Sequence, residues 1–382
     1  MNDFDISVHD LSTLDIEQYS LIDIRDSLSY SYGNIPGSKN IPTDTLYENY
    51  EKYLGKKLII YCKKGEISMD LVAFLRDKGL EAWNLKGGYL KWLMEHISLG
   101  KNNQGINTIS LDASKSIQKK FRKDIWCKFS KAVRDYELVK EGDKIAICIS
   151  GGKDSMLMAM LFQELKRHNK FKFDMEFLVM DPGYNHENRQ IIEDNAKKLD
   201  IPITVFESDI FETVLHVDRS PCYLCARMRR GHLYSKAKEL GCNKIALGHH
   251  YDDVIETILM GMLYGSQIQT MMPKLHSSNF EGMELIRPMY LIREDDIKKW
   301  RDYNNLYFIQ CACKFTDTCS IVDGKTSSKR MEIKKLIATM KESNPYVEGN
   351  IFKSVENVNL ATIIAYKKDG VKHHFLDDYD NI

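Results

Sequence analysis

The chain has 382 residues, of which 43% are hydrophobic and 28% charged, and its 54 Lys and Arg side chains balance its 54 Asp and Glu. This length suits two domains, and the zero net charge gives no general argument for binding nucleic acid. No stretch approaches the roughly 20 apolar residues that span a bilayer, and residues 1–10 lack the basic and apolar segments of a secretory signal. A cytoplasmic protein without a membrane partner is therefore expected.

The first hundred residues alternate short apolar runs with helical patterns. Strands are predicted at residues 21–24, 57–61 and 82–85, and a helix over residues 68–78. This alternation is typical of an α/β domain, and the polar segment 100–105 has the composition of a linker. The predicted organisation is a first domain at 1–100, a linker at 101–112, a second domain at 113–345 and a C-terminal extension of unknown role at 346–382.

A basic amphipathic stretch opens the second domain and predicts one helix over residues 114–136. Its cationic side chains fit either a solvated helix face or a surface for RNA phosphates. They are Lys115, Lys119, Lys120, Arg122, Lys123, Lys128, Lys131 and Arg134.

A buried-strand pattern at 144–149 ends in a glycine turn, and a helix is predicted over 155–166. Strand, glycine turn and helix together form a phosphate-binding unit. Further strands predicted at 176–180, 203–206 and 244–247, separated by helical patterns, imply a mostly parallel sheet covered on both faces.

The glycine turn has the composition of a phosphate loop. Glycines lack Cβ atoms, so backbone N–H groups can converge on an anion, and the dipole of the following helix adds a favourable field. A glycine turn without a ligand is the alternative. The residues of the loop are Ser150, Gly151, Gly152, Lys153, Asp154 and Ser155.

Cysteines gather in two places of the second domain. Cys222 and Cys225 form a C-x-x-C motif, and Cys311, Cys313 and Cys319 lie far downstream. Zinc would require four ligands in a closed tetrahedron, whereas an iron–sulfur cluster held by three cysteines would leave one iron open to a substrate atom. The residues alone leave both alternatives open.

A second polar motif follows the predicted strand at 244–247. Asp252 and Asp253, after Gly248 and His249, could hold Mg²⁺ and orient phosphates at the edge of a parallel sheet. Aspartate is also a common helix N-cap, which is the alternative for this pair.

These motifs, in this order, resemble the tRNA 2-thiocytidine synthetase family of the N-type ATP pyrophosphatase (PP-loop) superfamily. The matching segments are SGGKDS at 150–155, CYLCARMRRG at 222–231 and GHHYDDVIET at 248–257, within a resemblance that covers residues 119–313. It implies a PP-loop domain with a doubly wound parallel sheet. The implied reaction is the adenylation by ATP of the C2 oxygen of an anticodon-loop cytidine, at position 32, followed by the displacement of AMP by sulfur.

The resemblance also implies a site. A 4Fe-4S cluster would be held by Cys222, Cys225 and Cys311, and its open iron would carry the sulfur. The family has C-x-x-C downstream where this chain has Cys311-Ala-Cys313, so Cys313 is an alternative third ligand. The implied partner is tRNA, bound with the help of basic residues 119–131 and 227–230, and members are often homodimers. The implied catalytic residues are Lys153, Asp154, Cys222 and Cys225, and the implied ATP and Mg²⁺ site comprises Ser150 to Ser155, Gly248, His249, Asp252 and Asp253.

The first domain resembles a rhodanese domain from end to end. Cys62 would begin a loop whose N–H groups stabilise a thiolate or persulfide, and would therefore be a catalytic sulfur carrier. Ile67 and Asn34 replace an Arg and a His that are common in the family, which favours a persulfide donor such as a cysteine desulfurase over thiosulfate. An inactive domain with a buried Cys62 is the alternative. The matching segments are 21–25, 33–37, 60–68 and 85–88.

The sequence is also compatible with two other functions. One is a PP-loop sulfur transferase that acts on uridine in tRNA or on a small molecule, and loss of RNA binding would favour the small molecule. The other is a non-catalytic sulfur-relay or redox-sensing iron–sulfur protein, for which ATP would not be cleaved to AMP and pyrophosphate.

Overall fold

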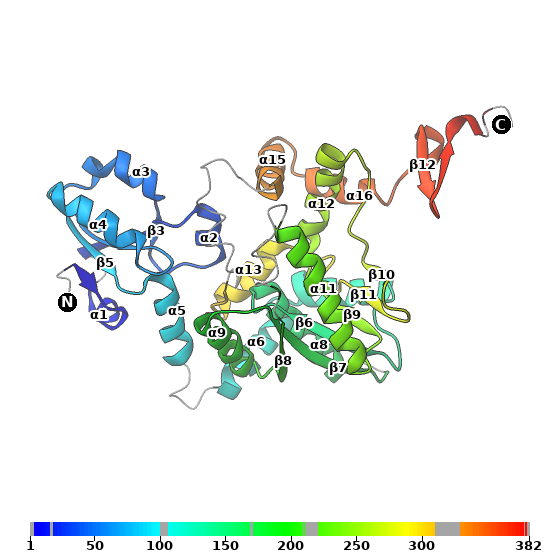
Figure 1. Cartoon of the computed structure of the whole chain (residues 1–382), viewed down its shortest axis with the longest axis horizontal. Helices are drawn as coiled ribbons and strands as arrows, with labels where there is room; N and C mark the ends of the chain where they lie inside the picture. Colours follow the sequence, from blue (N-terminus) through cyan, green and yellow to red (C-terminus); the bar gives the residue numbers. More distant parts are fainter. Residues whose placement is uncertain are drawn as a thin grey trace. The chain divides into compact units, whose positions relative to one another are not determined.

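The computed structural model describes residues 4–15, 18–99, 106–168, 171–208, 210, 221–309, 329–377 and 379. The chain forms two compact units (Figure 1). The first unit comprises Met1–His249 and Pro273–Cys319, and the second comprises His250–Met272 and Ser320–Ile382. Among the described helices, none is long and apolar enough to cross a membrane.

The first sheet of the first unit has five parallel strands in the order β1-β5-β4-β2-β3. The strands predicted in this region are confirmed as β2, β4 and β5, with shifts of at most two residues at their ends. The bounds are β1 (Asp5–Ile6), β2 (Tyr19–Asp23), β3 (Lys39–Asn40), β4 (Lys57–Tyr61) and β5 (Glu81–Leu85).

Short helices surround this sheet. The predicted helix over 68–78 is α4, which buries Leu71, Val72 and Leu75 at helical spacing against Leu58 and Ile60 of β4. The bounds are α1 (Val8–Thr13), α2 (Ser27–Tyr32), α3 (Thr43–Glu48), the 3₁₀-helix η2 (Tyr50–Tyr53), α4 (Ile67–Asp77) and α5 (Gly88–Leu99).

The second sheet of the first unit has the order β10-β11-β9-β6-β7-β8, and all of its pairs are parallel except β10 with β11. All five residues of β6 from Ile145 to Ile149 are buried, as expected for a strand covered on both faces. The bounds are β6 (Lys144–Ile149), β7 (Asp174–Asp181), β8 (Ile203–Glu207), β9 (Lys244–Ala246), β10 (Lys274–His276) and β11 (Glu284–Ile286).

Helices α8 and α11 both pack against the second sheet (Figure 1). The described helices of this part of the chain are α6 (Ile106–Gln118), the π-helical turn η3 (Arg122–Trp126), α7 (Cys127–Asp135), α8 (Lys153–His168), α9 (His186–Lys198), α11 (Pro221–Glu239) and α13 (Glu294–Tyr303).

The prediction of one continuous basic helix over 114–136 is wrong. The helix is interrupted between α6 and α7, where the Phe121 N–H donates to the carbonyl of Ser116, five residues back, at 2.9 Å. This wider turn keeps Ile117, Phe121 and Ile125 buried together. The basic residues therefore lie on two helices and a π-helical turn.

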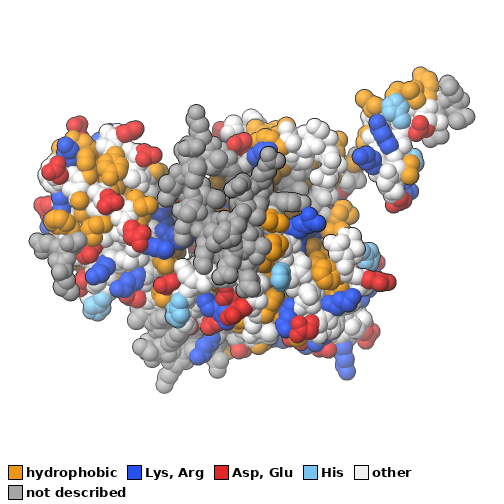
Figure 2. All heavy atoms as spheres, viewed as in Figure 1, with side chains coloured by type: hydrophobic (Ala, Val, Ile, Leu, Met, Phe, Trp, Pro, Cys, Tyr) orange, Lys and Arg blue, Asp and Glu red, His pale blue; other side chains and the backbone are white. Residues whose placement is uncertain are grey.

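The second unit consists of α12 (Tyr251–Gly265), α15 (Lys329–Ser343), α16 (Val347–Ser354), two 3₁₀-helices, η4 (Leu360–Thr362) and η5 (Phe375–Asp377), and the antiparallel hairpin of β12 (Ala365–Lys368) and β13 (Val371–His374). The three α-helices pack on one another. Apolar and basic side chains share the surface of the hairpin (Figure 2), where Ile364 and Val371 are exposed.

Candidate functional site

The phosphate loop follows β6, the strand of the second sheet at which the order of the strands reverses. The next two strands in the chain, β7 and β8, lie on one side of β6 in the sheet. The later strands β9 and β11 lie on the other side of β6. Adjacent strands whose connections run to opposite sides leave a crevice at their carboxyl ends, which is where open α/β sheets bind ligands. The loop after β6 and the segment after β9 begin at this edge, so the fold brings Ser150–Ser155 and Gly248 together.

Close packing requires glycine at position 151 of the loop and at position 248 beside it. Gly151 has φ 84°, and a Cβ there would lie 2.5 Å from Ile192 Cγ1 and 2.9 Å from Ile309 Cδ1. A Cβ at Gly248 would lie 3.3 Å from the backbone nitrogen of Ser155. The loop leads directly into α8, a helix of 16 residues, whose N-terminus favours an anion. These features fit the phosphates of ATP.

Lys153, the first residue of α8, is a buried cation with two carboxylate partners. Its Nζ atom lies 3.0 Å from Asp154 Oδ2 and 3.2 Å from Glu294 Oε1, and the residue is 3% exposed. Burial by itself would lower the pKa of Lys153, but the charges of Asp154 and Glu294 outweigh burial and raise it. Lys153 is therefore an ammonium ion. Glu294 lies in no motif that predicts a site, and its signal in the sequence is the acidic first turn of α13.

In the second unit, the predicted acidic motif forms the start of α12. Asp253 Oδ2 accepts a hydrogen bond from the His250 N–H at 3.0 Å, and Asp253 Oδ1 accepts one from Arg330 Nη1 at 2.6 Å. The N-cap of α12 is His250, and Asp253, the third residue of the helix, completes a capping box with it, so neither aspartate is itself the N-cap. Asp252 Oδ2 lies 3.7 Å from His250 Nδ1. Binding of Mg²⁺ by Asp252 and Asp253 stays a prediction.

Glu256, one turn into α12, has an unusual protonation equilibrium. It is 2% exposed, and burial raises its pKa from 4.5 to about 7 although Lys334 and Arg330 lie nearby. Between these two pH values the native state binds a proton that the unfolded state has lost, so the free energy of unfolding falls as the pH rises from about 4.5 to about 7. The loss amounts to at most about 3 kcal/mol.

Glu256→Gln is expected to abolish this pH dependence, because glutamine has nearly the same shape and does not titrate. The variant should be more stable than the wild type at pH values above about 7, the pKa of Glu256. The measurement is the thermal unfolding midpoint of both proteins across this range. Glu342→Gln, at an exposed position of α15, is the matched control and should follow the wild type. Parallel pH profiles for the wild type and Glu256→Gln would contradict the expectation.

The cysteines are only partly described. Cys222 and Cys225 belong to α11 and are three residues apart in the sequence, a spacing that suits two ligands of one cluster. Cys311, Cys313 and Cys319 lie outside the described residues. Ile309, the last residue described before them, packs against the phosphate loop, where a Cβ at Gly151 would lie 2.9 Å from its Cδ1 atom. Within the described ranges, no group of three or more His, Cys, Asp or Glu side chains is arranged to hold a metal ion.

Cys62 follows β4 and lies in a pocket of hydrogen-bond donors. Its Sγ atom lies 3.1 Å from the Gly65 N–H and 3.3 Å from Ser68 Oγ. The single hydroxyl proton of Ser68 is shared between this sulfur and Asn84 Oδ1, which lies 2.7 Å from Ser68 Oγ and which no sequence motif marks. A Cβ at Gly88 would lie 2.4 Å from the Cys62 carbonyl, so this loop too depends on glycine. Donors around sulfur stabilise a thiolate, although Cys62 is only 5% exposed.

Some of the basic residues predicted to contact RNA have partners within the chain. Lys128 pairs with Asp296 at 3.0 Å, and Lys131 pairs with Asp135. Arg229 donates to the hydroxyl of Tyr184 at 2.8 Å. The two ion pairs partly neutralise Lys128 and Lys131, whereas the hydrogen bond to the neutral Tyr184 hydroxyl leaves the charge of Arg229 in place. Ion pairs at a protein surface are weak, so RNA phosphates can replace the carboxylates of Asp296 and Asp135.

Comparisons with known proteins match both of the domains in which these residues lie. The family model of the PP-loop domain matches residues 121–313, and that of the rhodanese-like domain matches residues 9–95. A tRNA-cytidine(32) 2-sulfurtransferase of Anaeromyxobacter sp. (strain K) is 32% identical over 232 residues, covering 60% of this chain and 77% of that protein. One of Coxiella burnetii (strain RSA 493 / Nine Mile phase I) is 32% identical over 256 residues, covering 65% and 95%.

Among solved structures, the U34-tRNA thiolase NcsA from Methanococcus maripaludis with its 4Fe-4S cluster matches 68% of this chain and 82% of its own, with 19% identity and a TM-score of 0.48. The two family models confirm both resemblances drawn from the sequence. With the two parallel sheets, they also confirm the predicted fold class, a rhodanese-like α/β domain followed by a PP-loop domain.

Proposed function

We propose that this chain, which belongs to the family of the tRNA-cytidine(32) 2-sulfurtransferases, uses ATP to replace the C2 oxygen of a tRNA cytidine with sulfur. The observation that carries the proposal is the phosphate loop, placed at the switch point of a doubly wound sheet with the buried ammonium of Lys153 at the start of its helix. The family indicates that the acceptor is a tRNA cytidine, and the phosphate loop would bind the ATP that activates it.

The residues of the loop explain why ATP is consumed. A carbonyl oxygen is a poor leaving group, and transfer of AMP to it, with release of pyrophosphate, makes it a good one. The loop N–H groups and Lys153 would hold the phosphates and stabilise the charge that develops on pyrophosphate. Sulfur then attacks C2, and AMP departs with the oxygen. We further propose that Mg²⁺ binds with ATP through Asp252 and Asp253.

We assign the cysteines of the second domain to a 4Fe-4S cluster held by Cys222, Cys225 and Cys311. When bound, such a cluster supplies an open iron that can carry sulfur. The spacing of Cys222 and Cys225 within α11, and the packing of Ile309, two residues before Cys311 in the sequence, against Gly151 of the phosphate loop, support this assignment.

We assign Cys62 the role of sulfur carrier, loaded by a persulfide donor such as a cysteine desulfurase. The Gly65 N–H and the Ser68 hydroxyl would stabilise the negative charge on its sulfur. A carrier in the same chain raises the effective concentration of sulfur at the acceptor. The proposed domains are 1–100 for the carrier and 113–345 for thiolation.

Mass spectrometry of the nucleosides of tRNA tests the function. Cells that lack this protein should contain no 2-thiocytidine, and re-expression of the intact chain should restore it. Unchanged 2-thiocytidine in the deletion would refute the proposal. Loss of 2-thiouridine instead would show that the acceptor is uridine.

A further inference from the structure

The last residue of helix α2, Tyr32, lies beside the ammonium group of Lys153. The Lys153 Nζ atom is 4.6 Å from the centroid of the Tyr32 ring, a distance at which an aromatic face attracts a cation. Tyr32 belongs to the segment that matches the rhodanese-like domain, and Lys153 to the segment that matches the PP-loop domain. A side chain of the first domain therefore contributes to the surroundings of the phosphate-loop lysine.

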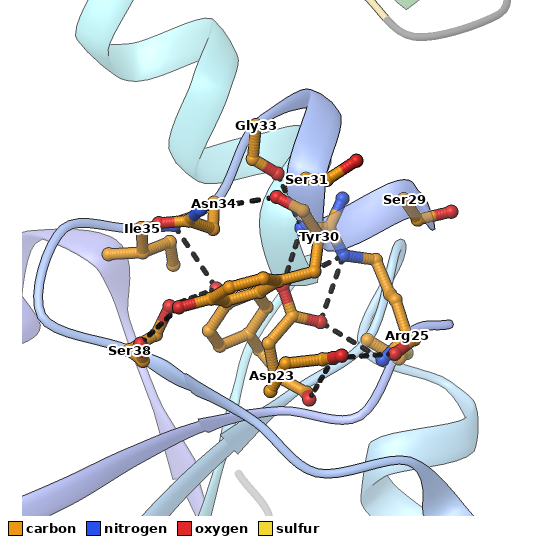
Figure 3. Close-up of polar contacts among 12 residues, drawn as sticks. Asp23, Arg25, Ser29, Tyr30, Ser31, Gly33, Asn34, Ile35 and Ser38 are labelled. Carbon is orange, nitrogen blue, oxygen red and sulfur yellow. Dashed lines mark hydrogen bonds and ion pairs between the residues drawn. The ribbon is translucent and has the colours of Figure 1, made fainter. Parts of the chain in front are cut away.

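Two arginines hold the backbone at Tyr32. Arg301, on α13, donates a hydrogen bond to the Tyr32 carbonyl. Arg25 donates through Nη2 to the carbonyl of Gly33, the next residue, at 2.7 Å, and is itself paired with the buried carboxylate of Asp23 (Figure 3). The backbone is thus held from both domains at the point where the ring meets Lys153.

A cavity of about 280 Å³ lies next to this contact, and Tyr32, Tyr89 and Arg301 are among its lining residues. Tyr32 is half-buried and borders this cavity, so its ring is not enclosed in a filled core. We therefore expect replacement of the ring by a smaller apolar side chain to leave the fold intact, which the unfolding midpoint of the variant checks.

We propose that Tyr32 is a positioning residue for adenylation, whose ring holds the Lys153 ammonium in the phosphate loop. This inference rests on the proposed function. Lys153 also pairs with Asp154 and Glu294. The phosphates of a nucleotide are anions and can replace these carboxylates as partners of the ammonium, whereas they do not compete for the face of a neutral ring. The ring therefore remains in contact with the ammonium when ATP binds, and the first domain helps to complete the ATP site.

The test compares two substitutions of Tyr32 in the full chain. Tyr32→Leu should raise the Kd for ATP with Mg²⁺ about tenfold, whereas Tyr32→Phe, which keeps the aromatic face, should stay within about twofold of the wild type. Isothermal titration gives Kd, and AMP formation with tRNA gives KM and kcat. KM should follow Kd, and kcat should change less. Tyr53→Leu is the matched control, because Tyr53 lies in the same domain with Lys56 Nζ 5.4 Å from its ring centroid, and it should bind ATP as the wild type does.

An unchanged Kd in Tyr32→Leu, or an equal loss of affinity in Tyr32→Phe, would overturn the proposal. Weaker ATP binding by a Tyr32→Leu variant with a wild-type unfolding midpoint would support it. A wild-type chain that binds ATP but forms no 2-thiocytidine would refute the proposed function, and the comparison of affinities would still decide the role of Tyr32.

Discussion

Cys222→Ala is expected to abolish 2-thiocytidine in tRNA, whereas Cys127→Ala is expected to leave it at the wild-type level. Removal of Cys222 would leave the proposed cluster with two cysteine ligands from this chain, and a cluster held by so few thiolates is lost. Cys127 is a free and exposed thiol on α7, so its removal controls for the loss of a cysteine elsewhere in the same domain. The measurement is the nucleoside content of tRNA from cells that express each variant.

The metal content of the purified variants tests the same prediction without any reaction. The wild type and Cys127→Ala should contain about four iron and four sulfide per chain, as a 4Fe-4S cluster requires, and Cys222→Ala should contain little of either. Zinc in place of iron in the wild type would contradict the cluster assignment. Separate Cys311→Ala and Cys313→Ala variants identify the third ligand, since only one of them should lose iron.

The second sheet shows which features a sequence predicts well. The strand predicted at 144–149 is β6 with the same bounds, because five consecutive apolar residues covered on both faces leave a continuous run. The sequence also predicts the phosphate loop, because a loop in which Gly151 has a positive φ and no space for a Cβ must contain glycine at that position. Both features depend on neighbouring residues in the chain.

The features that could not be predicted depend on contacts between distant segments. Glu294 and Tyr32 reach Lys153 from 141 residues downstream and from another domain, and neither lies in a motif. The break at Phe121 follows from the need to keep three apolar residues on a buried face, which a uniform helical period does not show. The order of strands around β6, which creates the crevice for the loop, likewise comes from tertiary structure.

Lys153→Met is expected to lower the rate of tRNA-dependent AMP formation about 100- to 1,000-fold, because a buried cation that stabilises developing phosphate charge would be lost. Methionine keeps much of the length of the side chain. Lys166→Met, later on the same helix, removes an exposed lysine that pairs with Asp174 and should retain wild-type activity. The rates are measured with radiolabelled ATP and unmodified tRNA.

Loss of stability could mimic loss of catalysis in Lys153→Met, because the substitution removes one of the two cations paired with the buried carboxylate of Glu294, Lys153 at 3.2 Å, and leaves only Lys298 at 3.4 Å. The double variant Lys153→Met with Glu294→Gln removes both charges and should recover much of the unfolding midpoint. If the ammonium acts on the phosphates, this double variant should stay as inactive as Lys153→Met. Recovery of AMP formation together with stability would instead mean that Lys153 only neutralises Glu294. The comparison therefore separates a lysine that serves the reaction from one that serves the fold.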